Sequence, residues 1–443
     1  SDSLTINTNA SLRLSGTSQL IQTHTGKKQI SGTGKLYIDQ TSQLTNKYQS
    51  GNWSSPVSTN GTTFSIKSVL KDGTNPTSSS SNPADINFTS SYDGAKTTPI
   101  TISKYWLAKL INDVDYTRQI NPEQVFMLPS EGWNMKSTGG GTQNFTFSGI
   151  PNDGEYKSTI NQNRLSLIGN PYPSSIDADK FLVDNNDAIS GTLYFYQAGD
   201  DTSHNRDQYK GGYATRVIGL GTSYGSGSTP SKYISVAQSF FVTRNSSETG
   251  TIKFTNAQRI ENTANNFFSK SRYAKNQKAS TSNFPILRLG FKFNVNKDEV
   301  FHRQVAIGFR GLTAKYEAGY DAEMFDLKPT DFSLNVEGST NPFVIIGIED
   351  FNHDLEIPLN VYANTNRTVT FKVDALENLN TKVYLKDKQT NQEYDLTDNS
   401  NITLELNEGN YYDRFVIKFK SGTLSLEDEF LRENIYTYID NNS

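Results

Sequence analysis

The chain has no cysteine among its 443 residues, and it has only three tryptophans, three methionines and four histidines. The lack of cysteine excludes disulfides, thiolate metal sites and cysteine nucleophiles. No stretch approaches the ~20 consecutive apolar residues of a membrane-spanning helix. The net charge is −4, from 42 basic and 46 acidic residues, so the chain also lacks the excess of positive charge that nucleic acid or an anionic membrane attracts. We therefore predict no nucleic-acid partner.

Aromatic residues are abundant, whereas aliphatic residues are scarce. Hydrophobic residues make up 34% of the chain, yet it contains 23 tyrosines and 25 phenylalanines. Disordered chains are depleted in aromatic residues, whereas half-buried β-sheets are rich in them. Helical periodicity is rare, and the expected strands include Phe64–Leu70, Leu193–Tyr196 and Phe240–Thr243. The sequence thus predicts an all-β protein, and its length predicts two to four domains.

A short repeat marks the first forty-odd residues. Leucines recur on an eight-residue grid from Leu4 to Leu44, with one gap at Lys28 and with glycines between them. The rungs of a parallel β-helix show this kind of spacing, and a simple β-meander is the alternative. We favour the first reading and predict a β-solenoid-like segment over residues 1–48.

The rest of the chain divides where its composition changes. Residues 49–260 alternate expected strands with long polar loops, which indicates a large, jelly-roll-like β-sandwich. Residues 261–284 are a polar linker whose Phe267-Phe268 pair is expected to dock on a neighbouring domain. Clean alternation from 285 to 421 predicts an immunoglobulin-like β-sandwich without its cysteine pair.

The segment Leu167–Tyr196 joins two apolar strands through a loop without obvious chemistry. Prolines 171 and 173 fix the backbone of a turn, because each restricts its own φ and the conformation of the preceding residue. Asp177 then stands where a capping side chain is expected at the start of a short helix. The segment contains no nucleophile, phosphate cradle or metal cluster, so we assign it to architecture.

Histidines and carboxylates do not form a recognisable metal or catalytic motif. No two histidines have metal-ligand spacing, and we interpret His302 as a hydrogen-bonded sandwich residue. Loops rich in Asp and Asn are able to supply oxygen ligands to calcium, but none matches an EF-hand, and helix caps or turns explain them equally well. We predict no cofactor and keep calcium as an alternative. The acidic groups in question are Asn112, Asp113 and Asp115; Asp177 and Asp179; Asp184 and Asp187; and Asp200 and Asp201.

The sequence also gives no specific sign of an enzyme. Glycoside hydrolysis needs two carboxylates ~5–10 Å apart, and any chain with 46 acids permits such a pair somewhere. The glycines and serines of residues 225–228 only approximate a hydrolase elbow, and they lie in a loop without the strand-to-helix context. We predict that the protein is not an enzyme.

The three tryptophans are the candidates for ligand contact. Trp53, Trp106 and Trp133 all lie in the predicted large sandwich, in a chain rich in tyrosine and asparagine. Flat aromatic rings cover the apolar faces of sugars while amides bond the hydroxyl groups. The competing interpretation, which we favour for each, is that tryptophans fill the core of the sandwich.

Several segments, in their combined order along the chain, resemble the modules of large surface proteins that Bacteroidetes bacteria export through the type IX secretion system. The segments of the middle module are NWSSPV (52–57), GWNMKSTGGG (132–141), TFSGIPNDGEY (146–156), LIGNPYPSSIDADKF (167–181), GTLYFY (191–196) and QSFFV (238–242). Those of the last module are FHRQVAIGF (301–309), YEAGYDAEMFD (316–326), VYLKDKQTNQEYDL (383–396) and EGNYYDRFVIKF (408–419).

This resemblance implies a secretion route and its partners. A protein of this family is carried across the outer membrane by the type IX translocon and handed to an outer-membrane shuttle barrel, directed by a β-rich C-terminal signal. Residues 422–443 resemble the start of such a signal. Its residues are expected to be Leu424, Leu426, Leu431, Ile435, Tyr436, Tyr438 and Ile439.

We therefore expect an exported cell-surface or extracellular protein that serves as an adhesin or as the stalk module of a larger protein. Its further partners would be glycans or another cell surface. The alternative function is a non-catalytic carbohydrate-binding region of a secreted polysaccharide-degrading protein.

Overall fold

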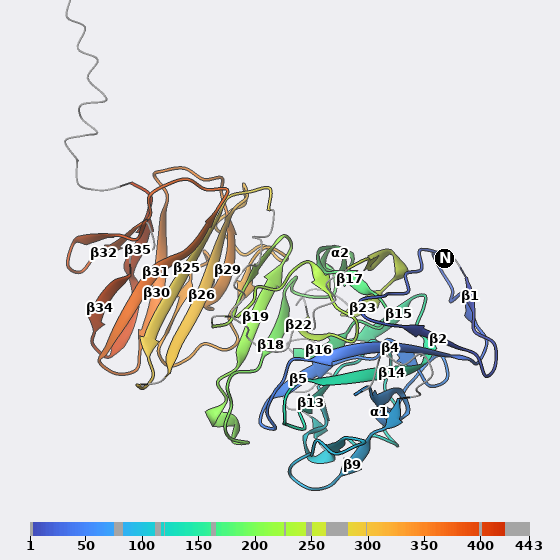
Figure 1. Ribbon diagram of the computed structural model, residues 1–443. Coiled ribbons are helices and arrows are strands. Elements are labelled where there is room, and N and C mark those ends of the chain that lie inside the picture. The colour runs from blue at the N-terminus through green and yellow to red at the C-terminus, as the bar shows by residue number, and fades with distance from the viewer. Residues whose placement is uncertain are drawn as a thin grey trace, which may run out of the picture.

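The structure, a computed structural model, confirms the all-β class (Figure 1). It describes residues 3–74, 83–110, 117–118, 120–160, 165–225, 227–244, 250–262, 282–297, 299–397 and 401–420. The sheets form two bodies that lie side by side, which we call the N-terminal module (residues 3–262) and the C-terminal module (residues 282–420). In the described parts of the chain, no helix is long and apolar enough to cross a membrane. The predicted Phe267-Phe268 contact and the predicted signal residues from Leu424 to Ile439 lie outside the described residues.

The first sheet of the N-terminal module contains both parallel and antiparallel strands. β2 pairs with β4 in parallel, and Leu12 of the leucine grid lies opposite Leu36. β1 and β3 form a separate parallel pair. β4 also pairs antiparallel with β14, so this sheet extends beyond the domain boundary predicted at residue 48. The strands of the sheet are β2 (Ser11–Leu14), β4 (Lys35–Ser42), β6 (Val57–Ser58), β7 (Leu70–Asp72), β8 (Ala84–Asp85) and β14 (Gln143–Pro151), and the separate pair is β1 (Leu4–Thr5) and β3 (Ile30–Ser31).

A second sheet covers the same hydrophobic core. β5 and β13 pair antiparallel and place Trp53 directly opposite Trp133, with both indoles buried. These rings pack with Phe64 and with Phe147. Phe147 lies on β14, so it comes from the first sheet. The elements are β5 (Ser50–Trp53), β11 (Ala108–Lys109), β12 (Thr117–Arg118), β13 (Trp133–Lys136), the separate pair β9 (Asn87–Thr89) and β10 (Thr101–Ser103), α1 (Ile66–Val69) and the 3₁₀ turn η1 (Lys104–Trp106).

The predicted strand Phe64–Leu70 is wrong, because α1 occupies its centre. Ser65 and Ser68 form a capping box, in which each side chain bonds the other residue's backbone, and this favours a helical turn. Ile66 and Val69 still reach the core from the turn. Burial of the apolar side chains therefore does not require the strand.

A five-stranded sheet forms the side of the N-terminal module that faces the C-terminal module (Figure 1). Its strand order is β16, β22, β18, β19, β20, and its inner face shares a core with α2. The strands of this sheet are β16 (Leu165–Gly169), β18 (Leu193–Gln197), β19 (Gly212–Val217), β20 (Leu220–Thr222) and β22 (Ser239–Thr243). Two smaller sheets complete this part of the module: β15 (Tyr156–Thr159) with β23 (Thr251–Phe254), and β17 (Ser175–Asp177) with β21 (Tyr233–Ile234) and β24 (Arg259–Ile260). The helical elements are α2 (Ala178–Asp184), η2 (Arg206–Gln208) and η3 (Asn256–Gln258).

The hydrogen bonds of the Leu167–Tyr196 segment agree with the structural role that the sequence predicts for it. Asp177 caps α2 by accepting from the backbone N–H groups of Asp179 and Lys180, as predicted. Asn170 donates to the carbonyl of Ser174 at 2.7 Å and closes the proline turn. The buried Tyr172 donates its hydroxyl to the carbonyl of Gly154 at 2.6 Å. The turn is therefore held from inside the module.

The C-terminal module differs from two separate immunoglobulin sheets. Its eleven strands form one continuous hydrogen-bonded sheet that surrounds a single core, and β26 and β29 within it run parallel. The strands are β25 (Ile286–Asn294), β26 (Val300–Phe309), β27 (Ala322–Glu323), β28 (Asp331–Leu334), β29 (Phe343–Ile348), β30 (Glu356–Ala363), β31 (Arg367–Glu377), β32 (Tyr384–Asp387), β33 (Gln392–Asp395), β34 (Ile402–Leu406) and β35 (Gly409–Lys418).

Candidate functional site

The two modules meet at a junction that contains a buried ion network. Arg303 of β26 is only 1% exposed and bonds both carboxylate oxygens of Asp331, at 3.1 and 2.7 Å. Its third nitrogen donates to Asp326 at 3.0 Å. Burial alone would lower the pKa of Arg303, but the charges of Asp326 and Asp331 outweigh burial and raise it. The guanidinium therefore stays charged, and it lies 5.2 Å from the ring centroid of Tyr224 in the N-terminal module.

Backbone hydrogen bonds also cross the junction. The N–H of Ile218 donates to the carbonyl of Gly319 at 2.9 Å, and Arg310 donates to the carbonyl of Ile218 at 2.6 Å. Val217 and Leu220 of the N-terminal module are buried in the core of the C-terminal module. Because the core and the backbone pairing are shared, the junction holds the modules as one body rather than as two domains on a flexible tether.

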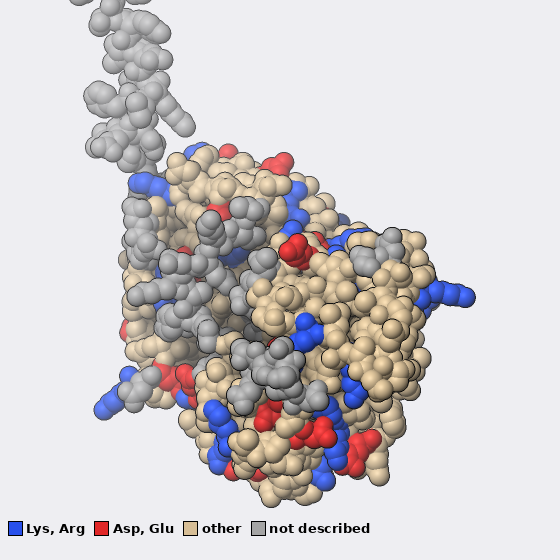
Figure 2. All heavy atoms as spheres, turned by 45° about the vertical axis from the view of Figure 1, so that its right-hand side comes forward, with Lys and Arg blue, Asp and Glu red and all other residues tan. Residues whose placement is uncertain are grey.

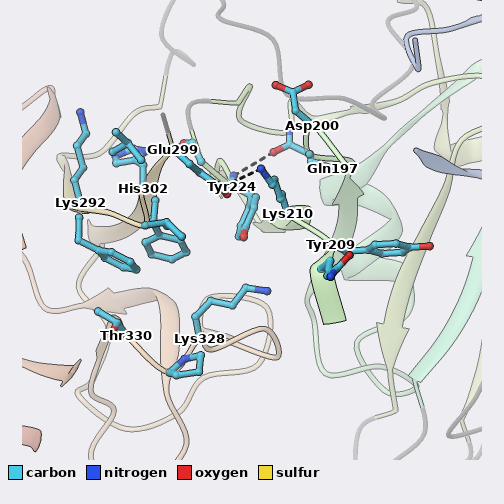
Figure 3. Close-up of a pocket in the computed structure, with 18 of the residues that line it drawn as sticks. Gln197, Asp200, Tyr209, Lys210, Tyr224, Lys292, Glu299, His302, Lys328 and Thr330 are labelled. Carbon is cyan, nitrogen blue, oxygen red and sulfur yellow. Dashed lines mark hydrogen bonds and ion pairs between the residues drawn. The ribbon is translucent and has the colours of Figure 1, made fainter. Parts of the chain in front are cut away.

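A cleft of about 1190 Å³ opens beside this junction and is lined by both modules. One wall is the end of β18 and the loop that follows it, from Gln197 to Lys210. The opposite wall comes from the β25–β26 hairpin, the loop at residues 328–330 and the start of β31. Figure 3 shows Lys292, His302 and Lys328 on one side and Gln197, Lys210 and Tyr209 on the other. We refer to this space as the inter-module cleft.

Positive charge collects on the C-terminal wall of the cleft. Lys292, Lys328 and Arg367 line it, and none of them makes an ion pair with a carboxylate among the described residues. Burial and the neighbouring ammonium group of Lys372 lower the pKa of Lys292. The opposing charge of Glu299 is already neutralised by Lys210 at 2.8 Å. The wall therefore presents three cations that make no ion pair of their own in the described part of the chain, although the charge of Asp374 acts on Lys292 and Asp200 and Asp207 also line the cleft.

His302 lies behind this wall and is fully hydrogen-bonded. Its Nδ1 lies 2.7 Å from the carbonyl oxygen of Gly225, and its Nε2 lies 2.9 Å from a carboxylate oxygen of Asp374. Burial raises the pKa of Asp374, but hydrogen bonds from His302, Lys372 and Gln304 outweigh burial and hold it well below its usual range. His302 is thus a hydrogen-bonded residue of the sheet, as predicted, and it bridges the two modules.

Aromatic rings line the same cleft. Phe293 and Phe301 stack with ring centroids 4.9 Å apart, and the guanidinium of Arg367 lies 4.4 Å from the ring centroid of Phe293. Tyr209 contributes a ring from the opposite wall. The cleft therefore combines flat apolar surfaces with unpaired cations.

A second aromatic cluster surrounds Trp106, in the N-terminal module. Tyr92 is 48% exposed and packs edge-on against the half-buried Trp106, with ring centroids 4.9 Å apart. His204 stacks on the indole at 4.9 Å, and the ammonium of Lys136 lies 4.0 Å from the centroid of Trp106. The same ammonium lies 5.0 Å from the ring of Tyr209, so the cluster adjoins the inter-module cleft.

The Lys136–His204 pair has a defined direction of hydrogen bonding. Burial lowers the pKa of Lys136 to about 8, and burial also lowers the pKa of His204 despite its bond to Asp93. Neutral His204 accepts from Lys136 at Nδ1 (2.7 Å) and donates from Nε2 to Asp93 (2.8 Å). Protonation of His204 would place two cations at hydrogen-bonding distance.

Acid should therefore destabilise this cluster. The unfolded chain protonates His204 near pH 6.5, whereas the folded chain does so only at lower pH. At a pH between the pKa values of His204 in the unfolded and folded states, the unfolded state binds more protons than the folded state. The free energy of unfolding therefore falls as the pH drops below 6.5. We expect the loss between pH 7 and pH 5, measured by urea unfolding, to be smaller in His204→Gln than in the wild type. Equal losses in the two proteins would contradict this role of His204.

The structure separates the three candidate tryptophans. Trp53 and Trp133 are 1% and 0% exposed, so they fill the core and are not available to a ligand. Trp106 alone lies at the surface, and Lys136 and His204 pack against it.

Four of the acidic groups weighed for calcium serve other contacts, among them Asp179, which pairs with Arg216, and Asp201, which accepts from the backbone N–H of Lys210. Asp177 caps α2, and Asp184 bonds Lys180 at 2.9 Å and Gln258 at 3.0 Å. Asp113 and Asp115 lie outside the described residues. Within the described ranges, no group of three histidines or acids is placed to hold a metal ion.

Sequence reasoning missed the cleft, because its residues come from distant segments. Lys292 and Lys372 alternate with the core phenylalanines Phe291, Phe293 and Phe371 along two strands, so alternation marks both lysines as outward-facing. The pairing of β25 with β31 is what brings them together.

Comparison with known proteins yields a single family. Residues 1–419 match the family described as Domain of unknown function (DUF8693). The match runs through both modules, so this family is defined by the two modules together. Neither the curated proteins nor the solved structures include a match to the chain.

Proposed function

We propose that this chain, which belongs to the family described as Domain of unknown function (DUF8693), is a non-enzymatic display module of a protein that the type IX secretion system exports to the cell surface. The junction around Arg303 is the observation that carries this proposal. A stalk or adhesin has to hold its binding surface at a fixed distance and orientation. One body built from two β-modules meets that need without disulfides.

The surface of the protein is consistent with an extracellular role. On the face shown in Figure 2, basic and acidic residues are interspersed, without an extended patch of one sign. Such a surface favours solubility and does not attract nucleic acid as a whole.

Cell fractionation tests the proposed route. In the producing bacterium, we expect the protein in the surface and medium fractions of the wild type. A strain without the type IX translocon should retain it in the periplasm, and deletion of the gene should reduce attachment of the cells to surfaces. Cytoplasmic protein in both strains would contradict the proposal.

Carbohydrate binding is a second candidate function, favoured by the exposed Tyr92 beside Trp106. Affinity gel electrophoresis with immobilised polysaccharides measures it. If the cluster is a sugar platform, Trp106→Ala should lose its retardation and Trp133→Phe, an alteration in the core, should keep it. Equal retardation of Trp106→Ala and the wild type would remove this cluster as the binding site.

A further inference from the structure

We propose that the inter-module cleft binds an acidic polysaccharide, a chain of sugars that carry carboxylate or sulfate groups. The proposal rests on the surface location proposed above, because such polymers occur outside the cell, but the binding itself can be measured on the purified protein. Three properties of the cleft support it: its cations, its aromatic rings and its size.

An excess of cations supplies the preference for negative charge. The cleft is lined by five basic residues and three acidic ones: Lys210, Lys292, Lys328, Arg367 and Lys372 against Asp200, Asp207 and Glu299. Lys292 and Lys372 lie close enough for their ammonium groups to repel each other, and the charge of Lys372 contributes to the low pKa of Lys292. Lys372 has a partner in Asp374 at 2.8 Å, whereas Lys292 makes no ion pair within the described ranges and feels the charge of Asp374 only at longer range. An anionic group bound between them would relieve the repulsion. Arg367 and Lys328 extend the same charge along the wall.

The aromatic rings supply affinity for the sugar itself. Phe301 and Tyr209 line the cleft beside these cations, whereas Phe293 is buried and supports Phe301 from the core. Flat rings cover the C–H faces of sugars, and the amide of Asn364, whose oxygen accepts from the Thr330 hydroxyl at 2.6 Å, places its NH₂ group where it can donate to a sugar hydroxyl. A site for a simple inorganic anion would not need these rings.

The size of the cleft indicates a polymer rather than a small metabolite. Its volume of about 1190 Å³ exceeds the ~300–1,000 Å³ of most small-molecule pockets. The cleft also lies between two modules that the junction holds in place. A polymer bound there would contact both walls without requiring them to move.

Binding of purified protein to four polymers tests the proposal. The probes are polygalacturonate for carboxylates, dextran sulfate for sulfates, neutral dextran, and duplex DNA, each measured by affinity electrophoresis at two salt concentrations. We expect retardation by one or both acidic polysaccharides, weaker at high salt, and none by neutral dextran. The polymer retained identifies the anionic group.

Matched variants locate the site. Lys292→Gln with Lys328→Gln should weaken binding about tenfold or more, because each variant residue loses a charge-assisted hydrogen bond to the bound anion. Lys315→Gln with Lys382→Gln makes the same change in net charge outside the cleft and should bind like the wild type.

A second pair of variants adds charge instead of removing it. Val300→Glu adds an acid at the cleft, at a position 59% exposed, and should also weaken binding. Val183→Glu, at a position 54% exposed on α2, is its control.

Three results would overturn the proposal: no retention of either acidic polysaccharide, equal retention of duplex DNA, or unchanged binding in both cleft variants. Each leaves the export experiment unaffected, because that experiment follows the location of the protein and not its ligand. A surface protein without this ligand would therefore be distinguishable from a protein that is not exported.

Discussion

Arg303→Met is expected to lower the free energy of unfolding by about 3–5 kcal/mol, because removal of one partner leaves a buried charge uncompensated. Asp331 is completely buried and would lose the guanidinium to which it is bonded at 2.7 Å. Asp326 would lose the same partner at the edge of the junction. Urea unfolding followed by tryptophan fluorescence and circular dichroism measures the loss.

The same variant should uncouple the two modules. Arg303 packs against Tyr224 of the N-terminal module, so its loss weakens the contact that makes them one body. We expect one unfolding transition in the wild type and two in the variant, seen by differential scanning calorimetry. Lys420→Met, which breaks the exposed pair with Asp354, should change neither property. A variant that unfolds like the wild type would show that the junction does not depend on this network.

Trp133→Ala is expected to cost about 3–5 kcal/mol of stability, because it removes a fully buried indole and leaves a cavity. Phe64 and Phe147 pack against this ring with centroids 5.6 and 6.4 Å away, and the backbone of two paired strands limits their collapse into the space. Equilibrium unfolding in urea measures the change.

Trp133→Phe is the control for the size of the cavity. The indole N–H of Trp133 has no hydrogen-bond partner among the described residues, so a phenylalanine removes an unsatisfied polar group while it keeps most of the ring. We expect its cost to be clearly smaller than that of alanine. Equal losses in the two variants would contradict a cost that is set by the size of the cavity.

The sequence predicted the class of fold and several local features. Alternation and aromatic content indicated β-sheets, and Asp177 marked the start of α2 because a capping aspartate acts locally. Where a local signal competed with alternation, prediction failed: the capping box of Ser65 and Ser68 turns the expected strand at 64–70 into a helical turn.

Long-range arrangement was less accessible. The leucine grid agrees with the parallel pairing of Leu12 with Leu36, but the antiparallel pairing of β4 with β14 depends on residues a hundred positions away. The junction and the cleft depend on Arg303, Asp326 and Lys292 meeting residues from other strands. Only strand pairing, which no local pattern encodes, brings these side chains together.

Location at the cell surface is the central claim, and labelling of intact cells tests it most directly. Because the chain has no cysteine, Val183→Cys introduces a single thiol at a position 54% exposed. A membrane-impermeant maleimide should label this variant on intact cells of the wild-type strain and not on cells without the type IX translocon. Val217→Cys, which is buried, should be labelled only after denaturation. Labelling of Val183→Cys only after lysis of wild-type cells would contradict the account.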